Sequence, residues 1–192
     1  MNRLLDTSAF RPLRRGLTLV ELLVVIAVLG VLISLVAPSM RGLIARQRVQ
    51  GINAELVTDI QLARSEVAQR SGESTKVMVS FGGNTDITCY AVHTEPVANC
   101  DCTRPPNTVC TAPAREIKAM QFTRAGGVSV AASSPSGSTV TFAPPQGLAT
   151  PGNLVIDVRD ATSGHLRTSI NAMGRASVCS PDGSIKGVTS SC

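Results

Sequence analysis

The chain has 192 residues, with 18 Lys and Arg against 13 Asp and Glu, and a formal net charge of +5. It has no Trp, one Tyr and four Phe, which leaves little material for stacking nucleic-acid bases. The sequence has two histidines and no G-x-S-x-G, Walker A or H-E-x-x-H motif. These features exclude the common hydrolase and nucleotide-binding classes of protein. We therefore expect neither enzymatic activity nor a cofactor.

The first 16 residues carry most of this net charge. Their cations outnumber the single carboxylate and give the segment +3, so the rest of the chain carries +2. Because positive segments stay on the cytoplasmic side of a membrane, we expect this leader in the cytoplasm and the remaining chain across the membrane. The basic net charge is thus weak evidence for nucleic-acid binding. The charged residues of the leader are Arg3, Asp6, Arg11, Arg14 and Arg15.

Residues 17–37 form an apolar run, LTLVELLVVIAVLGVLISLVA, of roughly the twenty residues that a helix needs to cross a bilayer. Its only ionisable side chain is Glu21, and a carboxylate inside a membrane is costly unless it finds a partner. The run lacks the closing A-x-A-like site of a secretory signal peptide. We predict a transmembrane helix over residues 17–40, in which Glu21 contacts another subunit.

Residues 41–72 predict an amphipathic continuation of this helix. Arg70-Ser71-Gly72 has the composition of a helix stop, whereas Pro38, Gly42 and Gly51 are expected to weaken the helix locally. The helix is therefore expected to run from residue 17 to residue 70, with its second half packed under a sheet. Apolar residues at three- and four-residue spacing form the predicted stripe: Val49, Ile52, Leu56, Ile60, Ala63 and Val67.

From residue 73 to residue 192 the sequence has the pattern of a β-rich domain. Short β-type runs alternate with Gly- and Pro-rich turns, which predicts antiparallel meanders. A long N-terminal helix followed by strands gives an α+β fold. The predicted strands are residues 76–81, 87–93, 116–122, 128–132, 138–142, 153–157 and 175–179.

The histidines and one pair of carboxylates come nearest to catalytic chemistry. His165 follows Gly164 and is expected in a solvated turn, and His93 is expected to end a strand. We interpret Asp157 and Asp160 as strand-end and turn residues rather than an acid–base couple.

All six cysteines follow the predicted membrane segment, and an even number in an oxidising compartment indicates disulfides. We favour a Cys179–Cys192 bond because these two are remote in sequence from the other four. Cys100 and Cys102 are too close to bond each other comfortably, so each is expected to pair with Cys89 or Cys110, in an order that spacing leaves open. The alternative is a zinc site of His93, Cys100, Cys102 and Cys110, whose spacing is not that of a common zinc module.

Arg14-Arg15-Gly16 followed by Leu-Thr-Leu-Val-Glu and an apolar helix resembles the class III signal of type IV pilins and type II secretion pseudopilins. The resemblance implies cleavage between Gly16 and Leu17 by a prepilin peptidase, and N-methylation of Leu17. Pro38 also matches a proline common at this depth in pilin helices. The resemblance further implies that Glu21 pairs with the amine of Leu17 on a neighbouring subunit in a fibre.

The β-rich region resembles the GspH/FimT group within this family. The matching segments are Tyr90-Ala91-Val92-His93-Thr94, Cys100-Asp101-Cys102, Cys110 and the stretch from Gly174 to Cys179. The resemblance implies a minor pilin or pseudopilin of a type IV pilus or a type II secretion system. It implies a single-pass protein of the bacterial inner membrane with a periplasmic domain. Its partners would be other pilins, the prepilin peptidase, the inner-membrane assembly platform and membrane lipid.

A second function remains open, that of a DNA receptor for natural transformation. FimT-type receptors are associated with a C-terminal Gly-Arg-x-Arg motif, of which Gly174-Arg175-Ala176-Ser177 keeps the first arginine and has Ser177 in place of the second. Arg167, Arg175 and Lys186 are the candidate DNA contacts, but three cations give modest, salt-sensitive phosphate binding at most. We favour solvated surface charges for these three residues.

Overall fold

The computed structural model describes residues 18–70, 75–133, 138–188 and 192, without the side chains of residues 36–39. The chain divides into two compact units, residues 1–40 and residues 41–192. One long helix, α1 (Leu19–Gln69), contributes to both. The cleavage site between Gly16 and Leu17 lies outside the described residues, so its processing stays a prediction.

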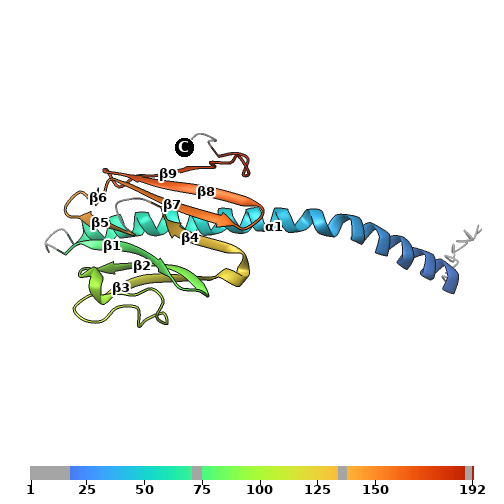
Figure 1. The fold of residues 1–192 in the computed structure, drawn as a ribbon, viewed down its shortest axis with the longest axis horizontal. Helices are drawn as coiled ribbons and strands as arrows, with labels where there is room; N and C mark the ends of the chain where they lie inside the picture. The colour runs from blue at the N-terminus through green and yellow to red at the C-terminus, as the bar shows by residue number, and fades with distance from the viewer. Residues whose placement is uncertain (1–17, 71–74, 134–137, 189–191) are drawn as a thin grey trace, which may run out of the picture. The chain divides into compact units, whose positions relative to one another are not determined.

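In the described part of the second unit, nine strands form two antiparallel sheets (Figure 1). The first sheet has the order β3-β2-β1-β5-β6, and the second has the order β4-β7-β8-β9. The strands of the first sheet are β1 (Val77–Gly83), β2 (Ile87–Thr94), β3 (Glu116–Thr123), β5 (Thr139–Ala143) and β6 (Leu148–Thr150). Those of the second are β4 (Val128–Ala132), β7 (Asn153–Asp160), β8 (Gly164–Asn171) and β9 (Ala176–Cys179). Short 3₁₀ helices, η1 (Val97–Asn99) and η2 (Arg124–Gly126), follow β2 and β3.

The core lies where the second half of α1 meets the two sheets. In Figure 1 this part of the helix runs along both sheets. The predicted stripe is buried: Val49, Leu56, Ile60, Ala63 and Val67 have no exposed surface, and Ile52 packs against them. Alternate residues of the strands face this stripe from both sheets, for example Val77 and Val79 of β1 and Leu154, Ile156 and Val158 of β7.

Two sets of buried polar contacts tie α1 to the sheets. The Tyr90 hydroxyl of β2 donates to Asp59 Oδ2 at 2.7 Å, and Lys118 Nζ of β3 donates to Asp59 Oδ1 at 2.8 Å. On the second sheet, the Thr168 hydroxyl of β8 donates to Asn53 Oδ1 at 2.7 Å. Because a polar group buried without a partner is costly, these contacts favour one position of the helix on the sheets.

The expected α+β architecture and all seven predicted strands are confirmed, with ends displaced by three residues or fewer. The helix continues through Gly42 and Gly51 despite their low helix propensity. Strands β6 and β8 were not predicted from the sequence, and the prediction that His165 lies in a solvated turn was wrong. His165 is a half-buried residue of β8, and Asp157 is a buried residue within β7 rather than at its end.

Candidate functional site

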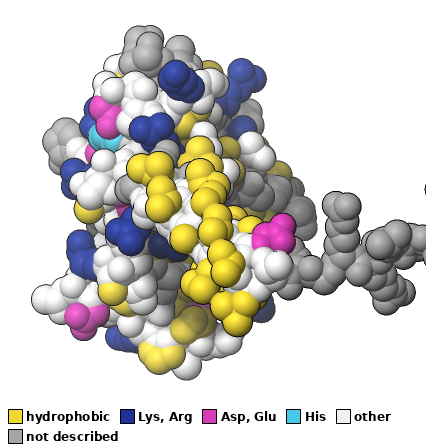
Figure 2. All heavy atoms as spheres, turned by 90° about the vertical axis from the view of Figure 1, so that its right-hand side faces the viewer, with side chains coloured by type: hydrophobic (Ala, Val, Ile, Leu, Met, Phe, Trp, Pro, Cys, Tyr) yellow, Lys and Arg dark blue, Asp and Glu magenta, His cyan; other side chains and the backbone are white. Residues whose placement is uncertain are grey.

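The first half of α1 is covered with apolar side chains that the rest of the chain does not bury. Every Leu, Val and Ile side chain from residue 19 to residue 35 is at least 46% exposed. Figure 2 shows hydrophobic side chains gathered in a continuous run. The Ser34 hydroxyl donates to the Val31 carbonyl at 2.7 Å and so makes its hydrogen bond inside the helix. An exposed apolar surface of this extent is typical of membrane or subunit contact.

Among the described residues, no single helix is long and apolar enough to span a membrane. Two consecutive pieces of α1, Leu19–Leu35 and Met40–Gln69, are long and apolar enough only when taken together.

Glu21 lies in the first turn of α1, where Thr18 caps the helix. The backbone N–H of Glu21 donates to Thr18 Oγ1 at 3.2 Å, and the N–H of Leu22 donates to the Thr18 carbonyl at 3.1 Å. A Thr at this position satisfies a backbone donor that the helix itself leaves open. Among the residues that the structure describes, no group bonds to the Glu21 carboxylate. This carboxylate can therefore accept a donor from another molecule.

Three disulfides bond all six cysteines. Cys179 bonds Cys192, which is the pair that the sequence favours. The open choice among the other four is resolved as Cys89–Cys102 and Cys100–Cys110. These two bonds fold the long connection between β2 and β3 onto the first sheet, where Cys89, Ala91, Cys102 and Val109 form a small buried cluster.

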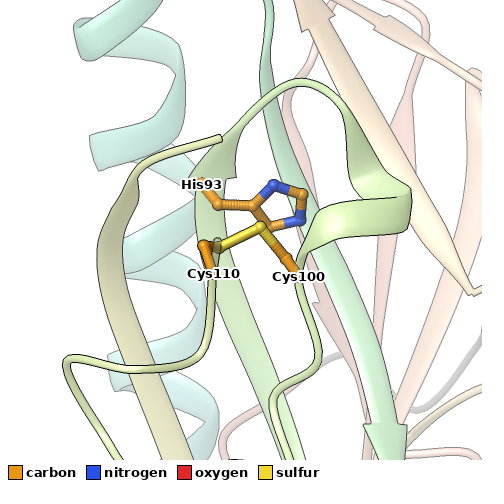
Figure 3. Close-up of side chains that lie close together, drawn as sticks. All are labelled: His93, Cys100 and Cys110. Carbon is orange, nitrogen blue, oxygen red and sulfur yellow. A yellow bond between two sulfur atoms is a disulfide. The ribbon is translucent and has the colours of Figure 1, made fainter. Parts of the chain in front are cut away.

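Three of the four alternative zinc ligands lie close together, but all four already bond to other groups. One nitrogen of His93 and the sulfurs of Cys100 and Cys110 lie within 4.8 Å of one another, as Figure 3 shows. Both sulfurs belong to one disulfide, and Cys102 is bonded to Cys89, so none of them is a thiolate. His93 Nδ1 lies 2.8 Å from the Thr94 carbonyl oxygen and Nε2 lies 3.0 Å from Ser80 Oγ. Burial lowers the pKa of His93, which fits a neutral structural histidine.

A charged cluster lies on the outer face of the second sheet. Asp157 Oδ1 accepts from Arg167 Nε at 2.8 Å and lies 2.9 Å from His165 Nε2. Burial raises the pKa of Asp157, but hydrogen bonds from Arg167, His165 and Ser133 outweigh it and lower the pKa to about 2. Arg167, one of the candidate DNA contacts, is therefore paired with a carboxylate of the same sheet.

The other candidate DNA contacts, Arg175 and Lys186, are exposed. Arg175 follows the turn after β8, where its backbone N–H donates to Asn171 Oδ1 at 2.9 Å. The structure thus places Arg167 and Arg175 on the β8–β9 hairpin and Lys186 in the loop that follows β9.

These features define a class of protein: a subunit with an apolar, exposed N-terminal helix that continues into the core of an antiparallel β-domain, as in pilins. Residues 11–37 match the prokaryotic N-terminal methylation motif, and residues 54–174 match the family described as type II transport protein GspH. The chain belongs to the GspH family.

A comparison with solved structures finds the crystal structure of the type IV minor pilin FimU of Pseudomonas aeruginosa strain PAO1. It is 16% identical, with a TM-score of 0.47, and the match covers 69% of this chain and 88% of FimU. Among curated proteins, no relative matches the chain.

Proposed function

We propose that the protein is a minor pilin or pseudopilin that assembles into a type IV pilus or a type II secretion pseudopilus. Its leader stays in the cytoplasm, prepilin peptidase cleaves after Gly16 and methylates Leu17, and the β-domain lies in the periplasm. The inner-membrane assembly platform then moves the subunit from the bilayer into the fibre. The observation that carries this proposal is the carboxylate of Glu21 on an exposed apolar helix, to which no group of the described residues bonds.

The chemistry of this carboxylate explains why assembly needs it. Thr18 satisfies the backbone N–H of Glu21, so the carboxylate is left to bind another charge. The amine of Leu17 on a neighbouring subunit supplies a positive charge at the start of the same apolar helix. Removing one partner of a buried ion pair costs about 3–5 kcal/mol, because the other charge stays buried without compensation.

The test is incorporation of Glu21→Ala into fibres. We expect the variant to be cleaved and inserted in the membrane but to be missing from purified fibres. Glu66→Ala is the matched control, since Glu66 only pairs with Arg70 one turn away on the domain surface. Fibres that contain Glu21→Ala at the level of the control would contradict the proposal.

The same proposal assigns the chain a structural role without catalysis or cofactor. Both histidines support it, because His93 is held between Thr94 and Ser80, and His165 contacts Asp157. A structural subunit needs surfaces that contact other subunits rather than a reactive group.

A DNA-uptake receptor is the second candidate. Arg167 in β8 and Arg175 in the turn before β9 belong to the same β8–β9 hairpin, which is the observation that favours this candidate. The bond of Arg167 to Asp157 weighs against it. Gel-shift titration of the detergent-solubilised chain separates the two: salt-dependent DNA binding lost in Arg175→Ala but kept in Arg104→Ala would establish the receptor.

A further inference from the structure

Five arginines gather where α1 enters the β-domain: Arg41, Arg46, Arg48, Arg124 and Arg159, named here the basic collar. We propose that the basic collar binds the headgroups of anionic phospholipids in the leaflet that borders the domain. The inference rests on the proposed function, because it requires that the apolar half of α1 lies in a bilayer.

Two turns of the β-domain pack against the start of the domain part of α1. Arg46 Nε donates to the Ser163 carbonyl of the β7–β8 turn at 3.1 Å. Arg48 donates from a terminal guanidinium nitrogen to the Gly126 carbonyl of η2 at 2.6 Å. The β7–β8 turn approaches so closely that a Cβ at Gly164 would lie 3.7 Å from the Cα of Arg46. These contacts hold both turns beside the helix.

The turns bring two more arginines to the same end of the domain. Arg46 and Arg159 line a hollow of about 310 Å³, and Arg124 and Arg159 line a second hollow of about 410 Å³. The two hollows share Arg159, Asp160 and Ala161, so they form one continuous surface. Figure 2 looks onto this end of the domain and shows Lys and Arg side chains at several places across it. Each hollow is thus lined by two arginines, whose guanidinium groups suit the oxygens of a phosphate.

The positive charge of the collar remains available. Arg46, Arg48 and Arg124 donate only to carbonyl oxygens, and within the described part of the chain none of the five collar arginines forms an ion pair. Asp160 and Asp182 line the hollows, and the backbone carbonyl of Asp86 accepts from the N–H of Arg124. Counting these three carboxylates against the five arginines leaves the set with a net charge of +2. Asp160 and Asp182 each direct one oxygen to N–H groups of their own turns.

Continuity with the apolar helix selects a lipid surface over a soluble polyanion. Arg41 follows Met40 directly, and Met40, Leu43 and Ile44 expose about half of their surface beside the collar. At about 1.5 Å per residue, Arg41 to Arg48 span on the order of 10 Å along the helix. The headgroup layer of a bilayer has a similar depth, and basic residues next to a membrane segment bind its anionic lipids.

The test uses the full chain in nanodiscs of equal parts phosphatidylcholine and phosphatidylglycerol, with native mass spectrometry of the lipids that stay bound. Each arginine near an anionic surface strengthens binding about fivefold, so Arg124→Gln/Arg159→Gln should retain phosphatidylglycerol about 25-fold less well. Arg104→Gln/Arg115→Gln removes the same charge from the exposed β2–β3 connection and should change nothing. In the wild type, hydrogen exchange of residues 124–127 and 160–164 should slow in the mixed discs and not in pure phosphatidylcholine.

Equal retention of phosphatidylglycerol by the two double variants would overturn the inference and leave the proposed function intact. Displacement of the lipid by a short DNA duplex that protects the same turns would also overturn it, since the collar would then be a nucleic-acid site. A chain that fails to insert into either nanodisc would contradict the membrane anchoring on which both proposals depend.

Discussion

Gly174 is a position where backbone conformation and a neighbouring side chain both require glycine. Its φ is +69°, and a Cβ there would lie 2.8 Å from the Gly147 carbonyl oxygen and 2.9 Å from Arg64 Nε. The glycine of the Gly-Arg pair is thus explained by packing against α1, without reference to a ligand.

We expect Gly174→Ala to lower the free energy of unfolding by about 3 kcal/mol, because the left-handed conformation and the close contact both penalise a Cβ. Gly183→Ala is the control, since Gly183 has a φ of +64° and open space around it. It should lose only about 1–2 kcal/mol. Urea unfolding of both variants measures the difference. If both variants lose the same free energy of unfolding, the contact with Arg64 does not contribute to the requirement for glycine.

Asp157 gives the stability of the domain a pH dependence of known sign. Its pKa is about 2 in the folded chain and about 3.9 in an unfolded one. The stabilisation is therefore complete above pH 5 and is lost as the pH falls through about 2. Asp157→Asn should cost about 2 kcal/mol at pH 7 and less than about 0.5 kcal/mol at pH 2.

Urea unfolding at pH 7, 4 and 2 measures this effect. Asp86→Asn, on an exposed turn, should stay within about 0.5 kcal/mol of the wild type at each pH. A constant difference between Asp157→Asn and the wild type across this range would show that Asp157 does not titrate as the contacts imply.

At the scale of elements, the helix and the first sheet are joined by a buried charge. The side chain of Asp59 is 3% exposed and contacts Lys118 of β3 and Tyr90 of β2. Burial lowers the pKa of Lys118, but the hydrogen bonds to Asp59 and Glu55 outweigh it and raise the pKa. Burial and the bond to Asp59 raise the pKa of Tyr90, so its hydroxyl stays a donor.

We expect Lys118→Met to lower the free energy of unfolding by about 3 kcal/mol, because the buried side chain of Asp59 would lose its cationic partner. Arg70→Met breaks a half-buried pair with Glu66 one turn away on the same helix and leaves no fully buried carboxylate, so it should cost at most about 0.5 kcal/mol. Adding Asp59→Asn to Lys118→Met should recover part of the loss, as measured by a double-mutant cycle. A cost no larger than that of Arg70→Met would contradict a structural role for this pair.

The elements also show where sequence patterns were sufficient. The stripe from Val49 to Val67 predicted the buried face of α1, because helical spacing depends only on neighbours along the chain. Strand β8 was missed because Gly164 and His165 have the composition of a turn. The alternation of Leu166, Thr168 and Ile170 was the signal that could have found it, since these three face the core.

For the whole molecule, the three disulfides predict that the domain matures in an oxidising compartment. We expect thiol labelling of the denatured protein from cells to modify no cysteine before reduction and all six after it. Non-reducing peptide mapping should recover the pairs Cys89–Cys102, Cys100–Cys110 and Cys179–Cys192. Free Cys100 and Cys110 in the native protein would instead revive the zinc alternative with His93.

The sequence by itself determined the apolar N-terminal helix, the single carboxylate Glu21 within it, and the β-rich domain that follows. Each of these depends on residues that are neighbours along the chain, so spacing and composition suffice. Only the tertiary structure decided the pairing of the four central cysteines, the bond of Arg167 to Asp157, and the gathering of the collar arginines. Strand register places Arg167 opposite Asp157 in the β7–β8 hairpin, and the folded β2–β3 connection brings the four cysteines together. The collar arginines lie far apart in the sequence, and the packing of two turns against α1 brings them together.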